Sequence, residues 1–226
     1  MNDGDALSNT AYKYLMDKIM NSELLPGELI NRRGIAKELG ISVAPVLEAI
    51  VLMENEGLME SLPRKGTRVS IVSVSDITGC LFLRDALEST AARYFCGKVI
   101  QNAMSYLLPM AKLLDQAPSH SNEYFRLDRE FHKALVALCR CDTYSVEHDR
   151  VTKLNLFHNI SQLLATSDPL ERKRHVELLE LLCSATPDEA SGIMHEHIIT
   201  GKGWLVYKGV SEQDTDVKAA TAQDRN

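Results

Sequence analysis

Residues 32–57 read RRGIAKELGISVAPVLEAIVLMENEG and predict two helices separated by a tight turn. Gly40 stands where a helix commonly ends in a left-handed residue, and Ser42 is a residue type that caps the start of the next helix. The second helix has apolar residues at helical spacing, namely Val46, Ile50 and Met53. We therefore expect helices over about 32–39 and 44–56, the second stopped by Gly57.

The flanking segments extend this pair of helices. About 8–21 carries an apolar stripe of helical spacing, formed by Tyr12, Leu15, Ile19 and Met20. After Gly57 the pattern alternates over 58–62 and again over 67–72, and Pro63-Arg64-Lys65-Gly66 joins the two stretches as a basic hairpin tip. Three helices and a hairpin within about 70 residues predict a winged helix-turn-helix.

The rest of the chain predicts an all-helical bundle of about six helices. Ser73 or Ser75 caps the first of them, which runs through Leu81, Arg84, Leu87 and Ala91. The others are expected near 99–115, 122–140, 145–165, 170–184 and 188–207. The expected fold is mainly α, with a winged helix-turn-helix domain at 1–74, a helical domain at 75–208 and a tail at 209–226 that has few apolar residues and is expected to be disordered.

The composition is that of a soluble protein. The 226 residues contain no run long and apolar enough for a membrane span and no basic and apolar signal sequence at the N-terminus, so we expect a cytoplasmic protein. The net charge of −6 argues against non-specific coating of nucleic acid, but it allows a local basic patch in the first third. The five cysteines form no CxxC pair and are interpreted as buried or idle thiols.

Two halves of the sequence resemble one known family in the right order. Residues 29–42, Pro45-Val46, Glu48-Ala49-Ile50, Glu56-Gly57-Leu58 and Arg64-Lys65-Gly66-Thr67 resemble the N-terminal domain of the GntR family of bacterial transcription regulators. The helical remainder resembles its FCD ligand-sensing domain. The resemblance implies a homodimer that binds a palindromic operator, with the second helix of the motif in the major groove and the wing in the minor groove. It also implies that a small metabolite alters this binding.

The sequence departs from the family at two positions. Family members usually have arginine where this chain has Val43 and Leu47. An arginine neutralises phosphate and can bind guanine through two hydrogen bonds, whereas Val and Leu offer only apolar contact, for example with a thymine methyl group. The residues predicted to contact DNA are Arg32, Arg33, Lys37, Ser42, Val43, Ala44, Leu47, Arg64, Lys65 and Gly66. The alternative for the cations is that they are solvated surface charges.

Four residues are candidate metal ligands. Asp128 and His132 are four apart on one helix face, and His175 and His197 each lie on the apolar stripe of a later helix. Hydrogen-bonded core histidines are the alternative interpretation. The order of an Asp, a His four residues later and one His from each of two further helices resembles metal-containing FCD domains, which implies a divalent ion. Zinc is the expected metal, and nickel, manganese and iron also suit these ligands.

The resemblance further implies a small organic acid as effector, bound at open positions of the metal. Arg84 matches the family's first-helix arginine and is the candidate to neutralise that acid, with a salt bridge to a neighbouring helix as the alternative. Asn155 and His158 are predicted to line the pocket. His120 and His148 are predicted to lie on the surface.

Two other classes of function remain open at this stage. An Asp and three His can activate water, so the chain could be a metal-dependent enzyme that has lost DNA binding. It could also be a metabolite-binding module that acts through a protein partner. Against an enzyme, no general base stands beside the proposed ligands, so we expect no enzymatic activity. The leading prediction is a metabolite-responsive regulator.

Overall fold

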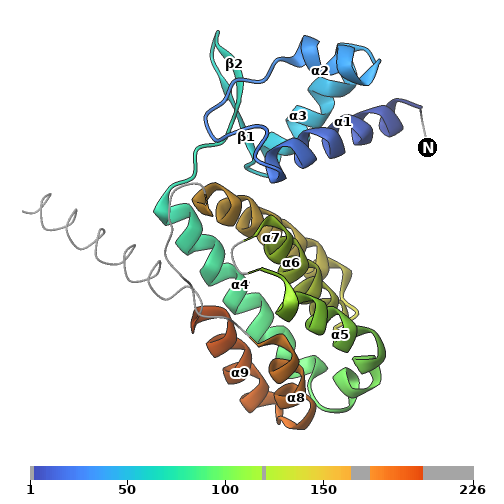
Figure 1. The fold of residues 1–226 in the computed structure, drawn as a ribbon, viewed down its shortest axis with the longest axis vertical. Helices are drawn as coiled ribbons and strands as arrows, with labels where there is room; N and C mark the ends of the chain where they lie inside the picture. The colour runs from blue at the N-terminus through green and yellow to red at the C-terminus, as the bar shows by residue number, and fades with distance from the viewer. Residues whose placement is uncertain (1–2, 119–120, 164–173, 201–226) are drawn as a thin grey trace, which may run out of the picture. The chain divides into compact units, whose positions relative to one another are not determined.

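The computed structural model describes residues 3–118, 121–163 and 174–200 (Figure 1). The chain divides into two compact units. The first comprises the chain up to Val72 and the segment that begins at Leu156, and the second comprises Ser73–Asn155 together with the last two described helices. None of the helices in these ranges combines the length and the apolar character needed to cross a membrane.

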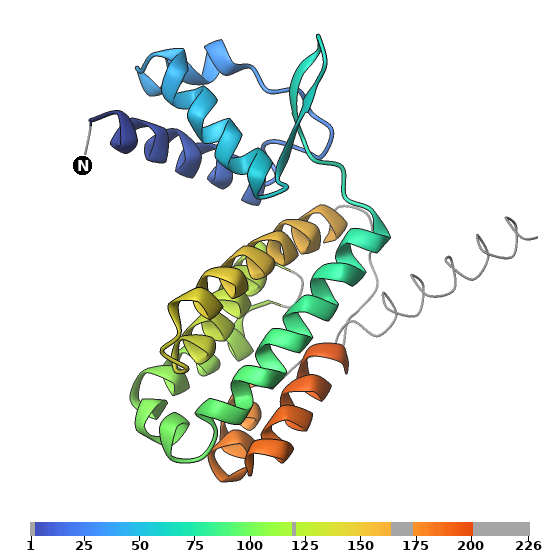
Figure 2. The same ribbon diagram turned by 180° about the vertical axis from the view of Figure 1, so that it is seen from behind.

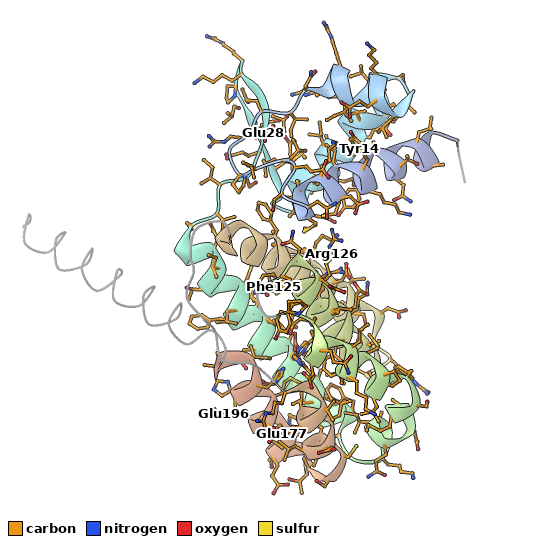
Figure 3. The ribbon with its side chains drawn as sticks, viewed as in Figure 1. Tyr14, Glu28, Phe125, Arg126, Glu177 and Glu196 are labelled. Carbon is orange, nitrogen blue, oxygen red and sulfur yellow. The ribbon has the colours of Figure 1, made fainter. Side chains whose placement is uncertain are left out.

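The N-terminal unit is built on two helices that pack against each other, α1 (Asp3–Met20) and α3 (Val43–Asn55). Their facing residues are buried: Ala11, Leu15 and Ile19 on α1, and Val46, Ala49, Ile50 and Met53 on α3. Two tyrosines of α1 form hydrogen bonds to other parts of the unit: Tyr12 donates to Glu56, and Tyr14 donates to Glu38. Tyr14 is labelled in Figure 3.

The turn between α2 (Arg32–Leu39) and α3 follows the sequence prediction closely. Asn31 caps α2 by accepting a hydrogen bond from the amide of Gly34 at 3.0 Å. Gly40 ends the helix with a φ of 67°, a conformation that glycine adopts without a steric penalty. Ser42 occupies the predicted N-cap position of α3 in an extended conformation. Its side chain makes no capping hydrogen bond, so the position was predicted correctly and the bond was not.

The wing is an antiparallel hairpin of β1 (Met59–Leu62) and β2 (Gly66–Val69), with Met59 opposite Val69. Both strands are shorter than the alternation predicted. Their tip turns sharply because Arg64 and Gly66 have positive φ. The segment before α2 pairs with the outer edge of β2, where the amide of Ile30 donates to the carbonyl of Thr67 at 2.8 Å. The hairpin tip and α2 lie toward the same end of this unit in both views (Figures 1 and 2).

The helical unit contains six helices within the described residues, in agreement with the predicted bundle. They are α4 (Val74–Phe95), α5 (Lys98–Gln116), α6 (Asn122–Ala137), α7 (Asp142–Leu163), α8 (His175–Ser184) and α9 (Pro187–Thr200). Ser73 starts α4 through a capping box with Asp76. The core is formed by side chains of five of these helices, among them Leu81, Phe95, Leu107, Phe131, Leu179 and Met194. Figure 2 shows α4 and α9 running side by side, as their packing requires.

Some helix ends differ from the sequence prediction. The first helix begins at Asp3 rather than near Ser8, and α6 ends at Ala137 because Arg140 adopts a positive φ, which no α-helix accommodates. The expected beginning of the fifth bundle helix at 170–173, the end of the last one at 201–208 and the tail at 209–226 lie outside the described residues. The five cysteines are free thiols.

Candidate metal centre and nucleic-acid interface

Three histidines from three helices meet inside the helical unit. His132 of α6, His175 at the start of α8 and His197 of α9 each offer a ring nitrogen, and these atoms all lie within 4.8 Å of one another. The Nε2 atoms of His132 and His197 are 3.3 Å apart. His132 and His175 have no exposed surface. The structure thus brings together three of the four predicted ligands by their nitrogen atoms.

Asp128, the fourth predicted ligand, lies beside two of these histidines. Its Oδ1 is 3.4 Å from the Nε2 of His175 and 3.6 Å from the Nε2 of His132. A tetrahedral zinc ion with ligands at about 2.0–2.1 Å holds its ligand atoms roughly 3.3–3.4 Å apart. Three of the distances between these donor atoms, 3.3, 3.4 and 3.6 Å, are close to this spacing, as expected for groups that could share one small cation.

Carboxylates behind two of the rings determine which nitrogen faces this centre. The Nδ1 of His175 donates to Asp115 of α5 at 2.8 Å, and the Nδ1 of His132 lies 2.5 Å from the Oε2 of Glu88. With protons on these Nδ1 atoms, both Nε2 atoms present lone pairs toward Asp128. The Nε2 of His175 is buried and has no hydrogen-bond donor among the described residues. A lone pair and a carboxylate oxygen that face one another repel unless a proton or a metal cation lies between them.

The charges around the centre keep its acidic groups ionised. Arg84 of α4 is buried and binds two carboxylates, Glu88 at 2.7 Å and Asp128 at 3.0 Å. Burial alone would raise the pKa of both carboxyl groups, but the charge of Arg84 outweighs it and holds each pKa well below the ordinary value. Burial lowers the pKa of His132 to about 4 against the charge of Glu88, so this ring is neutral at pH 7. Burial lowers the pKa of His175, but its bonds to Asp115 and Asp128 outweigh burial and raise the pKa above the ordinary value. Deprotonated carboxylates and neutral imidazoles are the forms that bind metals, so a metal at this centre would displace a proton from His175.

His148 corrects the sequence prediction. It was expected on the surface, but it has no exposed area and its Nε2 lies 2.9 Å from the Oε1 of Glu88. The α7 segment around it has a weak apolar pattern, so periodicity gave no sign that this face is buried. Glu88, Asp115 and His148 are polar neighbours of the site that the sequence did not reveal. An Arg and a Glu four apart on the buried face of α4 were the available signal for Glu88.

The predicted effector-binding residues have different positions. Arg84 points into the unit and is already paired with two carboxylates, which is the alternative that the sequence left open, although its Nη2 has no partner among the described residues. Asn155 is buried on α7. His158 also belongs to α7, but its side chain lies outside the described ones, as does His120. His195, off the apolar stripe of α9, is half-exposed and contacts Asp85.

Other side chains of the bundle lie away from this centre. Figure 3 labels Glu177 of α8 and Glu196 of α9, both of which are exposed, together with Phe125 of α6, which is buried.

Four of the predicted DNA-binding cations are exposed and have no ion pair with a described residue. They are Arg33 and Lys37, four apart on α2, and Arg64 and Lys65 at the wing tip. By contrast, Arg32 donates to the hydroxyl of Thr67 at 2.9 Å, and Arg68 pairs with Glu60. Unpaired cations on two neighbouring elements provide a surface that can bind phosphates.

The start of α3 presents small and apolar groups rather than charges. Ser42 and Ala44 are exposed, Leu47 is partly exposed, and Val43 is half-buried. No Arg or Lys occurs anywhere in α3. Gly66 at the wing tip has room around its Cα, so the backbone there can be approached closely.

This combination of a winged helix-turn-helix with a helical unit that bears a polar interior defines a two-domain transcription regulator. Residues 7–69 match the family of bacterial regulatory proteins known as the gntR family, and residues 80–200 match the FCD domain. The chain therefore belongs to the GntR family and carries an FCD domain.

Named relatives agree with this assignment. The chain is 27% identical to an uncharacterised helix-turn-helix-type transcriptional regulator, YdhC, of Bacillus subtilis over 68% of its length, which is 66% of that protein. It is 20% identical to the transcriptional repressor RspR of Escherichia coli over 88% of both chains. It is 26% identical to the Nta operon transcriptional regulator of Aminobacter aminovorans, covering 76% of this chain and 82% of that one. These relatives are transcription regulators rather than enzymes.

Solved structures share the fold. The E. coli protein McbR/YncC superposes with a TM-score of 0.71 at 18% identity, covering 89% of this chain and 98% of the other. A putative GntR regulator of Rhodococcus sp. RHA1 gives 0.70 at 17% identity, over 88% and 97% of the two chains.

Proposed function

We propose that this protein is a metabolite-responsive transcription regulator that binds palindromic operator DNA as a homodimer. The observation that carries this proposal is the set of exposed, unpaired cations Arg33, Lys37, Arg64 and Lys65 on α2 and the wing tip. A surface charge without an acidic partner is available to neutralise DNA phosphates. Because operators lie in the cytoplasm of bacteria, we expect the protein to act there.

In this proposal α3 enters the major groove and the wing enters the minor groove. Arg32 positions the wing through Thr67 and lies near the phosphates, and the free hydroxyl of Ser42 donates to a phosphate at the start of α3. Val43, Ala44 and Leu47 face the bases. The test is anisotropy of labelled duplexes at low salt, comparing DNA upstream of the protein's own gene with random duplex. Preference for one palindromic fragment is expected, and equal affinity for all duplexes would refute regulation through an operator.

We further propose that Asp128, His132, His175 and His197 hold one divalent metal ion, zinc in the first instance. The buried Nε2 of His175 without a donor, the carboxylates behind the rings and the donor spacing support this assignment. When bound, the ion would offer a positive charge and open coordination positions to an anionic ligand. Nickel, manganese and iron also bind imidazole and carboxylate, so the metal found depends on supply as well as on the site.

Metal analysis of purified protein tests the site. We expect about one equivalent in the wild-type protein and a large loss in His132→Ala and in His197→Ala. His195→Ala is the matched control on α9, because His195 is exposed and contacts Asp85 instead of the cluster. Equal metal content in all four proteins would remove the assignment.

The effector proposed for the metal centre is a small organic acid whose carboxylate completes the coordination of the ion. The Nη2 of Arg84 is a buried donor without a partner among the described residues and can serve a second oxygen of such an acid. Asn155 and His158 of α7 are the proposed wall of the pocket. A thermal-shift screen of organic acids, run on metal-loaded and metal-free protein, tests this. Stabilisation by an acid only in the presence of metal is expected, of about 2.7 kcal/mol at 100 times its dissociation constant.

A further inference from the structure

The outward face of α3 is apolar where a DNA-reading helix needs polar groups. Leu47, Glu48 and Val51 lie three, four and seven residues after Ala44, so the four residues form one stripe opposite the buried side of the helix. All four are exposed, Leu47 by 37% and Val51 by 52%. Leaving a leucine and a valine in water on one face forgoes the free energy that their burial would provide. Such a stripe is therefore a candidate contact surface.

The chemistry of this stripe selects among the base pairs. It contains no hydrogen-bond donor, so it cannot bind the N7 and O6 acceptors of guanine. Its one polar group, the carboxylate of Glu48, is an acceptor that suits the amino group of cytosine. In the major groove, thymine alone among the four bases carries a methyl group. Ala44, Leu47 and Val51 therefore match thymine and offer nothing to guanine.

Charge complementarity indicates DNA as the occupant. The stripe itself has no positive charge to attract phosphate, but α2 and the wing, which both contact α3, do. Arg33 and Lys37 extend from α2, and Arg64 and Lys65 from the wing, and none of these four forms an ion pair with a described residue. Cations at the two sides would bind the phosphate backbones and leave the apolar stripe against the bases between them.

We propose that the outward face of α3 reads thymine methyl groups in the major groove of the operator, mainly through Leu47 and Val51. This inference rests on the proposed function as a DNA-binding regulator and goes beyond it, because it specifies how the operator is recognised. Affinity would come from the cations and specificity from apolar contacts. The operator half-site would then contain thymines whose methyl groups line the path of α3.

Replacing thymine by uracil in a bound operator tests this directly, because the change removes the methyl group and keeps the base pair. The operator is first selected from random duplex DNA by the full-length protein. Each thymine of the half-site is then replaced by uracil in turn, and the affinity is measured. At the contacted positions we expect roughly a fourfold loss per methyl group, or about fifteenfold when both half-sites are changed. The salt dependence of binding should stay the same, since no phosphate contact is altered.

Substitutions in α3 connect this loss to the proposed residues. In Leu47→Ala and Val51→Ala the affinity for the thymine operator should fall toward that for the uracil operator, so that the preference for thymine shrinks. Leu52→Ala is the matched control. Leu52 is 49% exposed in the same helix, but it lies about 100° around the helix from Val51 and about 140° from Leu47. This variant should keep the full preference for thymine.

Several outcomes would overturn the inference. Equal affinity for thymine and uracil operators at every position would do so, and so would an undiminished thymine preference in both Leu47→Ala and Val51→Ala. A change in the mass of the free protein on Leu47→Ala, measured by light scattering, would identify the stripe as a contact between copies instead. If the selection yields no preferred duplex, the proposed regulation through an operator is wrong. If it yields a preferred duplex that binds equally well with uracil, only the proposed reading of thymine is wrong.

Discussion

The Oε2 of Glu88 in α4 lies 2.5 Å from the Nδ1 of His132 in α6, so a carboxylate of one helix orients a histidine of another. A carboxylate in this position fixes the tautomer that leaves Nε2 free, and removing such a partner typically costs about 10–100-fold in metal affinity. We therefore predict a loss of this size in Glu88→Gln, with full occupancy restored at saturating metal. Competition with a chromogenic chelator measures it, and Glu130→Gln, an exposed acid on α6, is the control.

Glu88 is buried and also binds Arg84 and His148, so its substitution affects folding as well. Asp115 offers a second variant at a half-buried position, where it accepts from the Nδ1 of His175 and from two amides at the start of α8. Asp115→Asn keeps an acceptor but loses the charge. We predict roughly tenfold weaker metal binding with little change in helix content by circular dichroism. Wild-type affinity in both Glu88→Gln and Asp115→Asn would contradict the role assigned to these carboxylates.

A charged cluster between α6 and α7 predicts a dependence of stability on pH. Asp149 lies 2.7 Å from both Arg129 and Lys133. Burial raises its pKa, but the bond from Lys133 and the charge of Arg129 outweigh it, and the pKa falls below its ordinary value of 3.8. A lowered pKa in the folded state means that Asp149 stabilises the fold above about pH 4 and that this contribution disappears as the pH falls through the folded pKa.

Asp149→Asn should accordingly lower the stability of metal-free protein by about 1 kcal/mol at pH 7, a value reduced for its partial exposure. The difference from wild type should vanish below the folded pKa. Urea unfolding at several pH values measures it, with the exposed pair of Glu147 and Arg150 as control through Glu147→Gln. A difference that persists unchanged at pH 2 would exclude the electrostatic explanation.

The proposed homodimer predicts that an apolar part of the helical unit is covered by a second copy. Phe82 and Leu83 are neighbours on α4, and each is 50% exposed. Burying these side chains favours association, whereas placing a charge there opposes it. We predict that Phe82→Glu shifts the protein from dimer to monomer in light scattering and keeps its helix content. A dimer of unchanged strength would locate the interface elsewhere.

Much of the fold could be predicted because local signals decided it. Gly40 was predicted as a left-handed helix end and has a φ of 67°, and Val46, Ile50 and Met53 were predicted as core and are buried. The start of α4 was predictable for the same reason, because Ser73 and Asp76, which form its capping box, are only three residues apart in sequence. Local chemistry failed at Ser42, where the residue type predicted a side-chain cap that is not formed.

The candidate site was only partly predictable, because its parts are distant in sequence. The spacing of Asp128 and His132 reports a shared helix face, and the structure brings His175 and His197 beside them. Asp115 lies in the last turn of α5 without a periodic signal, and His148 lies on a helix of weak amphipathicity, so the contacts of both arise from tertiary packing. The pairing of Arg84 with both Glu88 and Asp128 likewise depends on how α4 meets α6.

The central claim, that the cations of α2 and the wing bind operator phosphates, is tested most directly by the salt dependence of operator binding. Each phosphate contact contributes about 0.9 to the slope of log affinity against log salt concentration. In a dimer, Arg33→Ala and Lys65→Ala should each reduce the steepness by roughly 1.8, whereas Lys98→Ala on the helical unit should leave it unchanged. If both variants keep the slope of the wild-type protein, the proposed mode of DNA binding is wrong.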